Sequence, residues 1–239
     1  MSAIRDLPRV ATIATMPSRL ETFQEVFHAL RAQVDHVFIY LDGYAEPPAF
    51  LAGIDRITVR RAEQVGNIHS SSRFLCLGEL NTPAVVVCAD DDIMYPGNYA
   101  AVLADVLHAM DGKALVGVHG RIYLPPHASY VHDALCYHFA DKLDRTIHVH
   151  EIGCGTCAFV SDRLTVDPLK WDVHGMDDLN MAIEAQGRGF PRVAVARPEG
   201  WLRPYTESQD DSLWSKKVKN DSEQSWRMRA LLARYARQD

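Results

Sequence analysis

Short apolar runs alternate along the chain with segments whose apolar positions recur at helical spacing. Runs of strand length occupy residues 10–14, 37–41, 57–59, 84–88, 114–118 and 156–160. Apolar residues repeat every three to four positions in 20–30, 99–110 and 179–186, which is typical of amphipathic helices. Strands that are apolar throughout and joined by helical crossovers indicate a sheet covered by helices on both faces. The pattern therefore predicts an α/β fold with a mostly parallel, mixed central sheet.

The region 117–155 has no clear period. It contains Pro125-Pro126 and six of the eleven histidines. We interpret it as loops and short strands over one end of the sheet.

Composition narrows the class of protein. Hydrophobic residues make up 47% of the 239 residues and charged residues 23%, enough apolar material for a sizeable core and too much for intrinsic disorder. No apolar run reaches the roughly eighteen residues that a membrane span needs. The N-terminal residues lack the apolar stretch of a signal peptide, and the five cysteines are scattered, so we expect a cytoplasmic protein with reduced thiols.

Charge is distributed unevenly between the body and the tail. The net charge is −6, and the segment 212–239 has a local balance of +4, which leaves about −10 for the remainder. An acidic body argues against a broad nucleic-acid surface. In the tail, Trp226, Ala230, Ala233 and Arg237 are spaced to share one face of a basic helix. A solvated terminal helix and a helix that contacts a membrane surface or phosphates both fit this pattern.

Three consecutive aspartates, Asp90, Asp91 and Asp92, follow the most apolar predicted strand. In open α/β sheets, ligands bind at the carboxyl ends of the strands. Adjacent carboxylates repel one another, so the cluster favours a cation, and oxygen ligands suit Mg²⁺ or Mn²⁺. The alternative interpretation is a solvated acidic turn or helix N-cap.

The segment ADDDIMYP resembles the DXD element of GT-A-fold nucleotide-sugar glycosyltransferases, and other landmarks of that family follow in matching order over about residues 8–203. The resemblance implies a single GT-A-type, Rossmann-like α/β/α domain over 1–203. Its nucleotide-sugar half would span 8–116 and its acceptor half 117–203, with a helical tail over 204–239. It also implies Mn²⁺ or Mg²⁺ as cofactor, a UDP-sugar as donor and a glycan or other hydroxyl compound as acceptor.

The resemblance further implies residue roles. ATMPSRLETF resembles the segment that frames the donor's base and places Thr15, Pro17 and Arg19 there, and Asp42 matches the family acid that contacts uracil or ribose. Arg73 is the best candidate for binding diphosphate. Asp92 is favoured as the direct metal ligand, with Asp90 nearer the ribose and also available to the metal, and Asp91 beside the nucleotide. The register of the DXD element stays open.

On the acceptor side, Gly175-Met176-Asp177-Asp178-Leu179 resembles the family's late acidic pair. Asp178 is our candidate general base, because an acceptor hydroxyl must lose its proton as it attacks. Asp177 or His174 would orient the base or the acceptor. Trp201 and the glycine-rich turn at Gly155 match positions near the acceptor. The family's late histidine ligand has no counterpart, because no histidine follows His174.

A second candidate metal site consists of His148, His150, Cys154 and Cys157. Two histidines and two cysteines are a common ligand set for a four-coordinate zinc ion. The Cys-x-x-Cys pair is also compatible with redox chemistry. Against zinc, these residues are crowded into ten positions, and a strand pattern begins within them.

We therefore expect a metal-dependent glycosyltransferase, with the family setting pointing to bacterial surface polysaccharide and an inverting reaction if Asp178 is the base. Four alternatives remain: a retaining enzyme of the same fold, a nucleotidyltransferase, a glycosyltransferase acting on phage DNA bases, and a non-catalytic module that binds sugar nucleotides or glycans. We expect the protein in the cytoplasm, with the basic tail offering a peripheral contact at the inner face of the membrane.

Overall fold

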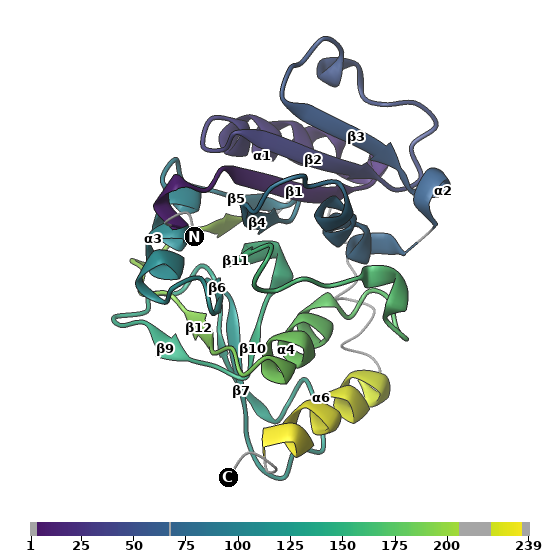
Figure 1. Ribbon diagram of the computed structural model, residues 1–239. Coiled ribbons are helices and arrows are strands. Elements are labelled where there is room, and N and C mark those ends of the chain that lie inside the picture. Colours follow the sequence, from purple (N-terminus) through teal and green to yellow (C-terminus); the bar gives the residue numbers. More distant parts are fainter. Residues whose placement is uncertain (1–3, 67, 206–220, 236–239) are drawn as a thin grey trace.

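Eight strands form one mixed sheet in the computed structural model, which describes residues 4–66, 68–205 and 221–235 (Figure 1). Their order across the sheet is β3-β2-β1-β4-β11-β6-β12-β9. The strands are β1 (Arg9–Thr15), β2 (His36–Leu41), β3 (Ile57–Arg61), β4 (Val85–Ala89), β6 (Leu115–Gly117), β9 (Ile147–His148), β11 (Cys157–Val160) and β12 (Arg192–Ala194). β1 pairs in parallel with β2 and β4, and parallel pairs also join β2 to β3 and β6 to β12. β11 is antiparallel to β4 and β6, and β9 to β12, so the predicted mixed, mostly parallel sheet is confirmed.

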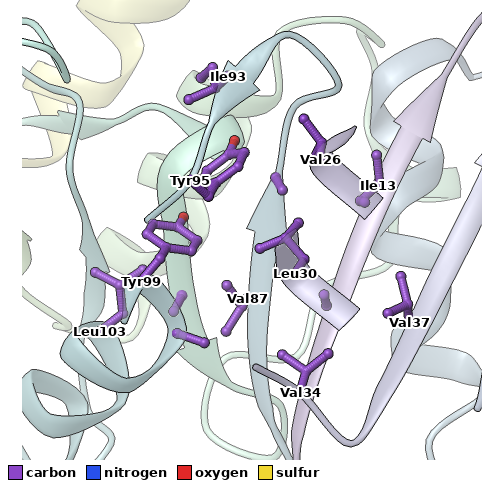
Figure 2. Close-up of a cluster of buried hydrophobic side chains, with 14 of the residues drawn as sticks. Ile13, Val26, Leu30, Val34, Val37, Val87, Ile93, Tyr95, Tyr99 and Leu103 are labelled. Atoms are coloured by element: carbon purple, nitrogen blue, oxygen red, sulfur yellow. The ribbon is translucent and has the colours of Figure 1, made fainter. Parts of the chain in front are cut away.

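Helices α1 (Leu20–Arg31) and α3 (Tyr99–Ala109) cover one face of this sheet. Every third or fourth residue of α1 is apolar and buried, including Phe23, Phe27 and Leu30, so the helix presents one apolar stripe to the strands. Figure 2 shows Leu30 of α1 and Tyr99 of α3 within the cluster that these helices form with the sheet. The predicted helices over 20–30 and 99–110 are confirmed.

The other face is covered by η4 (His69–Gly78) and α4 (Asp177–Gly187). Alternate residues of β4 point to opposite faces, so Val85 and Val87 belong to the first cluster while Val86 and Cys88 pack with Phe74 of η4. This alternation between two buried faces explains why the strand reads as a continuous apolar run.

Smaller elements complete the second half of the chain. A three-stranded antiparallel sheet, in the order β10-β7-β8, consists of β7 (Gly120–Tyr123), β8 (Ala134–Tyr137) and β10 (Glu151–Ile152), and β5 (Ile93–Met94) pairs with β13 (Arg203–Pro204). Of these strands, β7, β8 and β10 match the short strands expected in 117–155. The remaining helical segments are η1 (Ile4–Asp6), η2 (Pro17–Arg19), η3 (Ala49–Leu51), α2 (Ala62–Val65), η5 (Cys154–Thr156), η6 (Pro168–Lys170) and α6 (Ser222–Tyr235).

The C-terminal helix α6 lies against α4, in the lower part of Figure 1. Met228 and Leu231 are fully buried in a cluster with Leu179 and Ala182 of α4. One face of the helix is therefore packed against the body of the protein. On the face that we predicted, Trp226 is 60% exposed, and Arg237 lies outside the described residues.

Within 4–66, 68–205 and 221–235, none of the helices combines the length and the apolar character that crossing a bilayer requires.

Candidate functional site

A cavity of about 380 Å³ opens at the carboxyl ends of the parallel strands β1, β2 and β4. It is bounded by the residues that end or follow these strands, by η4 and η5, and by the start of α4. Most of the predicted site residues line it: Thr15, Arg19, Asp42, Arg73, Asp90, Asp91, Asp92, Gly155, Asp177 and Asp178. Segments more than 150 residues apart in the sequence therefore meet in one place.

Two buried arginines face the aspartates that follow β4. A terminal nitrogen of Arg73 lies 2.7 Å from Asp90 Oδ1, and Nη1 of Arg19 lies 3.8 Å from Asp92 Oδ2. Arg19 and Arg73 are 5% and 4% exposed. The cluster of negative charge that the sequence places here is thus partly balanced from within the protein.

Arg73 is held on all sides. Its guanidinium donates to the carbonyl oxygens of Ser70 (3.0 Å), Ala89 (3.1 Å) and Cys154 (3.5 Å) in addition to its ion pair. Burial alone would lower the pKa of Arg73, but the carboxylates of Asp90 and Asp177 outweigh it and raise that pKa. In this geometry Arg73 fastens η4 and η5 to the end of β4 and orients Asp90. We expected Arg73 to contact the diphosphate directly. Such a contact would compete with the carbonyl groups and the Asp90 carboxylate that the guanidinium already binds.

Gly155 allows Asp90 to occupy its position. A Cβ atom at Gly155 would lie 1.8 Å from Asp90 Oδ2, far inside van der Waals contact. Tyr95 ties the same two segments together, because its hydroxyl donates to the Gly155 carbonyl (2.5 Å) and accepts from the Asp90 amide (2.9 Å). Gly155 is therefore needed for the shape of the carboxylate cluster, beyond its place in the cavity wall.

Asp91 is the middle one of the three aspartates that follow β4. Burial raises the pKa of its carboxyl to about 7, and the neighbouring carboxylates of Asp92 and Asp90 add to the rise. A side-chain contact with Thr15, which also lines the cavity, opposes this rise and lowers the pKa of Asp91.

Asp42 follows β2 and lies beside η4. Its Oδ2 is 3.3 Å from Nδ1 of His69, and both residues line the cavity. The two side chains present a carboxylate and an imidazole at the edge of the cavity farthest along the sheet from β11.

The acidic pair at the start of α4 is held by two separate loops. Asp177 is buried, and its Oδ1 accepts a hydrogen bond from Ser71 Oγ (2.5 Å). Asp178 is partly exposed to the cavity, and its Oδ1 accepts from the backbone amide of Cys154 (2.7 Å). The first turn of a helix favours negative charge. Asp177 thus links η4 to α4, and Asp178 presents a fixed carboxylate to the cavity.

Pro17, His174 and Trp201 do not line the cavity. Pro17 is exposed on η2. Trp201 packs at 6.1 Å from the Tyr99 ring, and its Nε1 donates to Asn98 (3.2 Å), so it supports α3 instead. His174 precedes the lining residue Gly175, and its buried Nδ1 has no hydrogen-bond partner among the described residues.

The cavity also contains residues that our sequence analysis did not select. They are aromatic or uncharged polar side chains from the second half of the chain: His119, Tyr130, Phe139 and Gln224. Only the accumulation of histidines and aromatics in 117–155 hinted at them, and nothing in the sequence indicated Gln224.

The zinc hypothesis is not supported. No group of three or more histidine, cysteine, aspartate or glutamate side chains is arranged to hold a metal ion in residues 4–66, 68–205 and 221–235. His148 is exposed on β9, Nδ1 of His150 accepts from the Tyr123 amide, and Cys154 and Cys157 are buried free thiols. Burial raises the pKa of the Cys154 thiol, which also argues against a reactive redox pair.

The carboxylates of Asp90 and Asp92 remain the donors available to a metal in this cavity. They form no closed cage, but Mg²⁺ and ions like it are held in proteins by one or two carboxylates, with water and substrate phosphates completing the shell. The donor set fits that kind of ion.

Comparisons with known proteins give a weak likeness to solved structures. No family model and no curated protein matches the chain. Two matching structures are of glucosyl-3-phosphoglycerate synthase from Mycobacterium tuberculosis. One, in complex with Mn²⁺, UDP-glucose and phosphoglyceric acid, has a TM-score of 0.44 and 15% identity, and covers 68% of this chain and 60% of that chain. The other, with Mn²⁺, UDP and glucosyl-3-phosphoglycerate, has a TM-score of 0.40 and 15% identity, and covers 54% of this chain and 48% of that chain. The matches thus span about half to three fifths of those proteins.

Proposed function

We propose that this chain is a metal-dependent glycosyltransferase that moves a sugar from a UDP-sugar to a hydroxyl acceptor. The observation that carries the proposal is one cavity in which Asp90 and Asp92, oriented by buried arginines, share a wall with the fixed carboxylate of Asp178. Such a cavity has one group of oxygen donors for a metal–diphosphate and a separate carboxylate for proton transfer.

On the donor side, Asp92 and Asp90 would hold Mn²⁺ or Mg²⁺, which when bound supplies Lewis-acid stabilisation of the departing diphosphate. Arg19 adds a cationic group next to Asp92. Asp42 and Thr15 line the same cavity at the ends of β2 and β1, where we place the ribose and the base. Asp91 lines the same cavity, and we assign it to the nucleotide-binding residues.

On the acceptor side, Asp178 accepts the proton of the attacking hydroxyl. Its Oδ1 accepts a hydrogen bond from the Cys154 amide, which fixes the orientation of the carboxylate toward the cavity. Asp177 orients the helix start through Ser71. Direct attack with Asp178 as base inverts the anomeric centre.

We place the reaction in the synthesis of bacterial surface polysaccharide, on the basis of the family resemblance alone. The site would then be at the inner face of the membrane. Trp226 and Arg229, both exposed on α6, offer an amphipathic surface for a peripheral contact with lipid headgroups.

The first test is metal-dependent nucleotide binding. A ligand at a hundred times its dissociation constant stabilises a protein by about 2.7 kcal/mol. UDP with Mn²⁺ should therefore raise the melting temperature of the wild type. Asp92→Asn should abolish this shift, whereas Asp105→Asn, a matched change on the exposed side of α3, should keep it. No shift with any uridine nucleotide would refute the proposal.

The second test separates an enzyme from a binding module. Asp178→Asn keeps the oxygen that accepts from Cys154 and removes the proton acceptor. UDP binding should survive, and transfer should fall about a hundredfold or more. Asp177→Asn should cost less. Full activity of Asp178→Asn with retained configuration in the product would indicate a retaining mechanism.

A further inference from the structure

Helix α6 brings a mostly buried glutamine, Gln224, into the wall of the cavity. Gln224 is 5% exposed and belongs to the cavity wall, beside the start of α4. Its side chain makes no hydrogen bond within the described residues. Neither amide atom is among the fully buried polar atoms that lack a partner, so the amide is open to the cavity and can hydrogen-bond a ligand there.

The helix that carries Gln224 is fixed at several points. Asp221 Oδ2 accepts from Ser129 Oγ (2.5 Å) and from the Val131 amide (2.9 Å), and Ser225 Oγ accepts from the Tyr130 amide (2.8 Å). The next turns are anchored by buried Met228. Gln224 is therefore held in place before any ligand binds.

Tyr130 stands next to this anchor and also lines the cavity. Its hydroxyl donates to Glu151 (2.8 Å), and the Arg121 guanidinium lies 4.5 Å from the centre of its ring. The Tyr130 hydroxyl is thus bound to Glu151, and Arg121 packs against the Tyr130 ring. Phe139 adds a second aromatic side chain to the same cavity wall.

An amide and an aromatic surface beside a carboxylate match a neutral sugar ring. The amide of Gln224 can donate to one hydroxyl and accept from the next, and aromatic side chains cover apolar faces of a ligand while polar groups fix its orientation. We propose that Gln224, with Tyr130, binds the acceptor and selects a neutral carbohydrate. The inference rests on the proposed function and names the substrate class of its acceptor site.

Binding of neutral glycosides to the full chain tests this proposal. Saturation-transfer NMR would measure the affinity for methyl glycosides and neutral disaccharides in the presence of UDP and Mg²⁺. At least one of them should bind the wild type. Gln224→Leu, which keeps side-chain bulk, and Gln224→Ala should each weaken that binding about tenfold, the scale of one or two lost hydrogen bonds. Glu223→Ala, one position earlier and exposed, should leave it unchanged.

Other outcomes overturn the inference. Equal glycoside affinity in the wild type and in both folded Gln224 variants would remove Gln224 from the site. Wild type that binds UDP yet no neutral glycoside, or that prefers phosphoglyceric acid to every glycoside, would refute the neutral acceptor while leaving the donor site standing. Wild type that fails to bind UDP would instead refute the proposed function.

Discussion

Gly155 and Asp90 depend on each other at the scale of a single atom. The space that a side chain at position 155 would take is filled by the Asp90 carboxylate, with an ideal Cβ only 1.8 Å from Oδ2. The obstacle is a carboxylate that is also tied to Arg73 at 2.7 Å. A change at residue 155 therefore acts on the predicted metal ligands, 65 positions away in sequence.

Gly155→Ala should displace Asp90, weaken its ion pair and lower the affinity for Mn²⁺ and UDP at least tenfold, measured by calorimetric titration. The cost of overpacking a well-filled site, about 1–3 kcal/mol, should appear in denaturant unfolding. Gly78→Ala is the control, because nothing lies within 4 Å of a Cβ at that position. Unchanged metal affinity in Gly155→Ala would place the ion away from Asp90.

Glu151 is a buried carboxyl outside the proposed chemistry. Tyr123 and Tyr130 donate to its two oxygens at 2.5 and 2.8 Å. Burial raises the pKa of Glu151 to about 7 from 4.5, Asp178 adds to the rise, and Arg121 and the two tyrosines oppose it. Between pH 4.5 and 7 the folded chain thus binds more protons at this site than the unfolded chain. Its contribution to the free energy of unfolding is present at low pH and is lost as the pH rises through about 7.

Glu151→Gln should remove this dependence. Relative to the wild type, the variant should gain about 2–3 kcal/mol of unfolding free energy at pH 8 compared with pH 5. Urea unfolding at the two pH values measures the difference. Asp91 titrates in both proteins, so its contribution cancels in the comparison. A difference between the two proteins that does not change with pH would mean that Glu151 keeps an ordinary pKa in the fold.

Among the elements, helix α6 contributes most to the acceptor side of the cavity that the sequence did not predict. It packs on α4, the helix that starts with Asp177 and Asp178, and its buried side chains complete a third hydrophobic cluster with Tyr123, Tyr130 and Leu179. The first residues of α6 are bonded to the loop at 129–131. The helix is thus a supporting wall of the acceptor side.

Met228→Ala tests this role, because Met228 is completely buried between α6 and α4. Truncation of a buried methionine costs about 2–5 kcal/mol. Trp226→Ala, on the exposed face of the same helix, should change the unfolding free energy by less than about 0.5 kcal/mol. Chemical denaturation of both variants measures the contrast. Equal, near-zero effects would mean that α6 is detached in solution.

At the scale of the whole molecule, the site lies where the strand order reverses. The chain runs outward through β1, β2 and β3, and then returns to place β4 on the other side of β1. The crossovers on either side of this switch point leave a crevice at the carboxyl ends of the strands. Thr15 ends β1 and Asp90 follows β4, so the cavity opens at this reversal. The antiparallel strand β11 then joins the second half, which supplies Gly155 and the acidic pair.

Much of this arrangement could be predicted because it depends on local patterns. Apolar runs and helical spacing determine β1, α1, β4 and α3, since burial on a sheet or helix face imposes a period that is visible within a dozen residues. The position of the site at the carboxyl ends of the strands could also be predicted, because polar residues directly after parallel strands meet at one end of the sheet. The three aspartates after β4 were found in this way, whereas Asp42 was selected from the family resemblance.

Contacts between distant segments were decided only in the tertiary structure. The hydrogen bonds and close packing that join Arg73 to Asp90, Gly155 to Asp90 and α6 to α4 depend on how whole elements meet, and no periodicity encodes them. For the same reason Trp201, which the family resemblance placed near the acceptor, packs against Tyr99. Gln224 enters the cavity from a tail helix whose packing on α4 no sequence pattern indicated. A hydrophobic period shows that a face is buried, but the partner face depends on the packing of the whole chain.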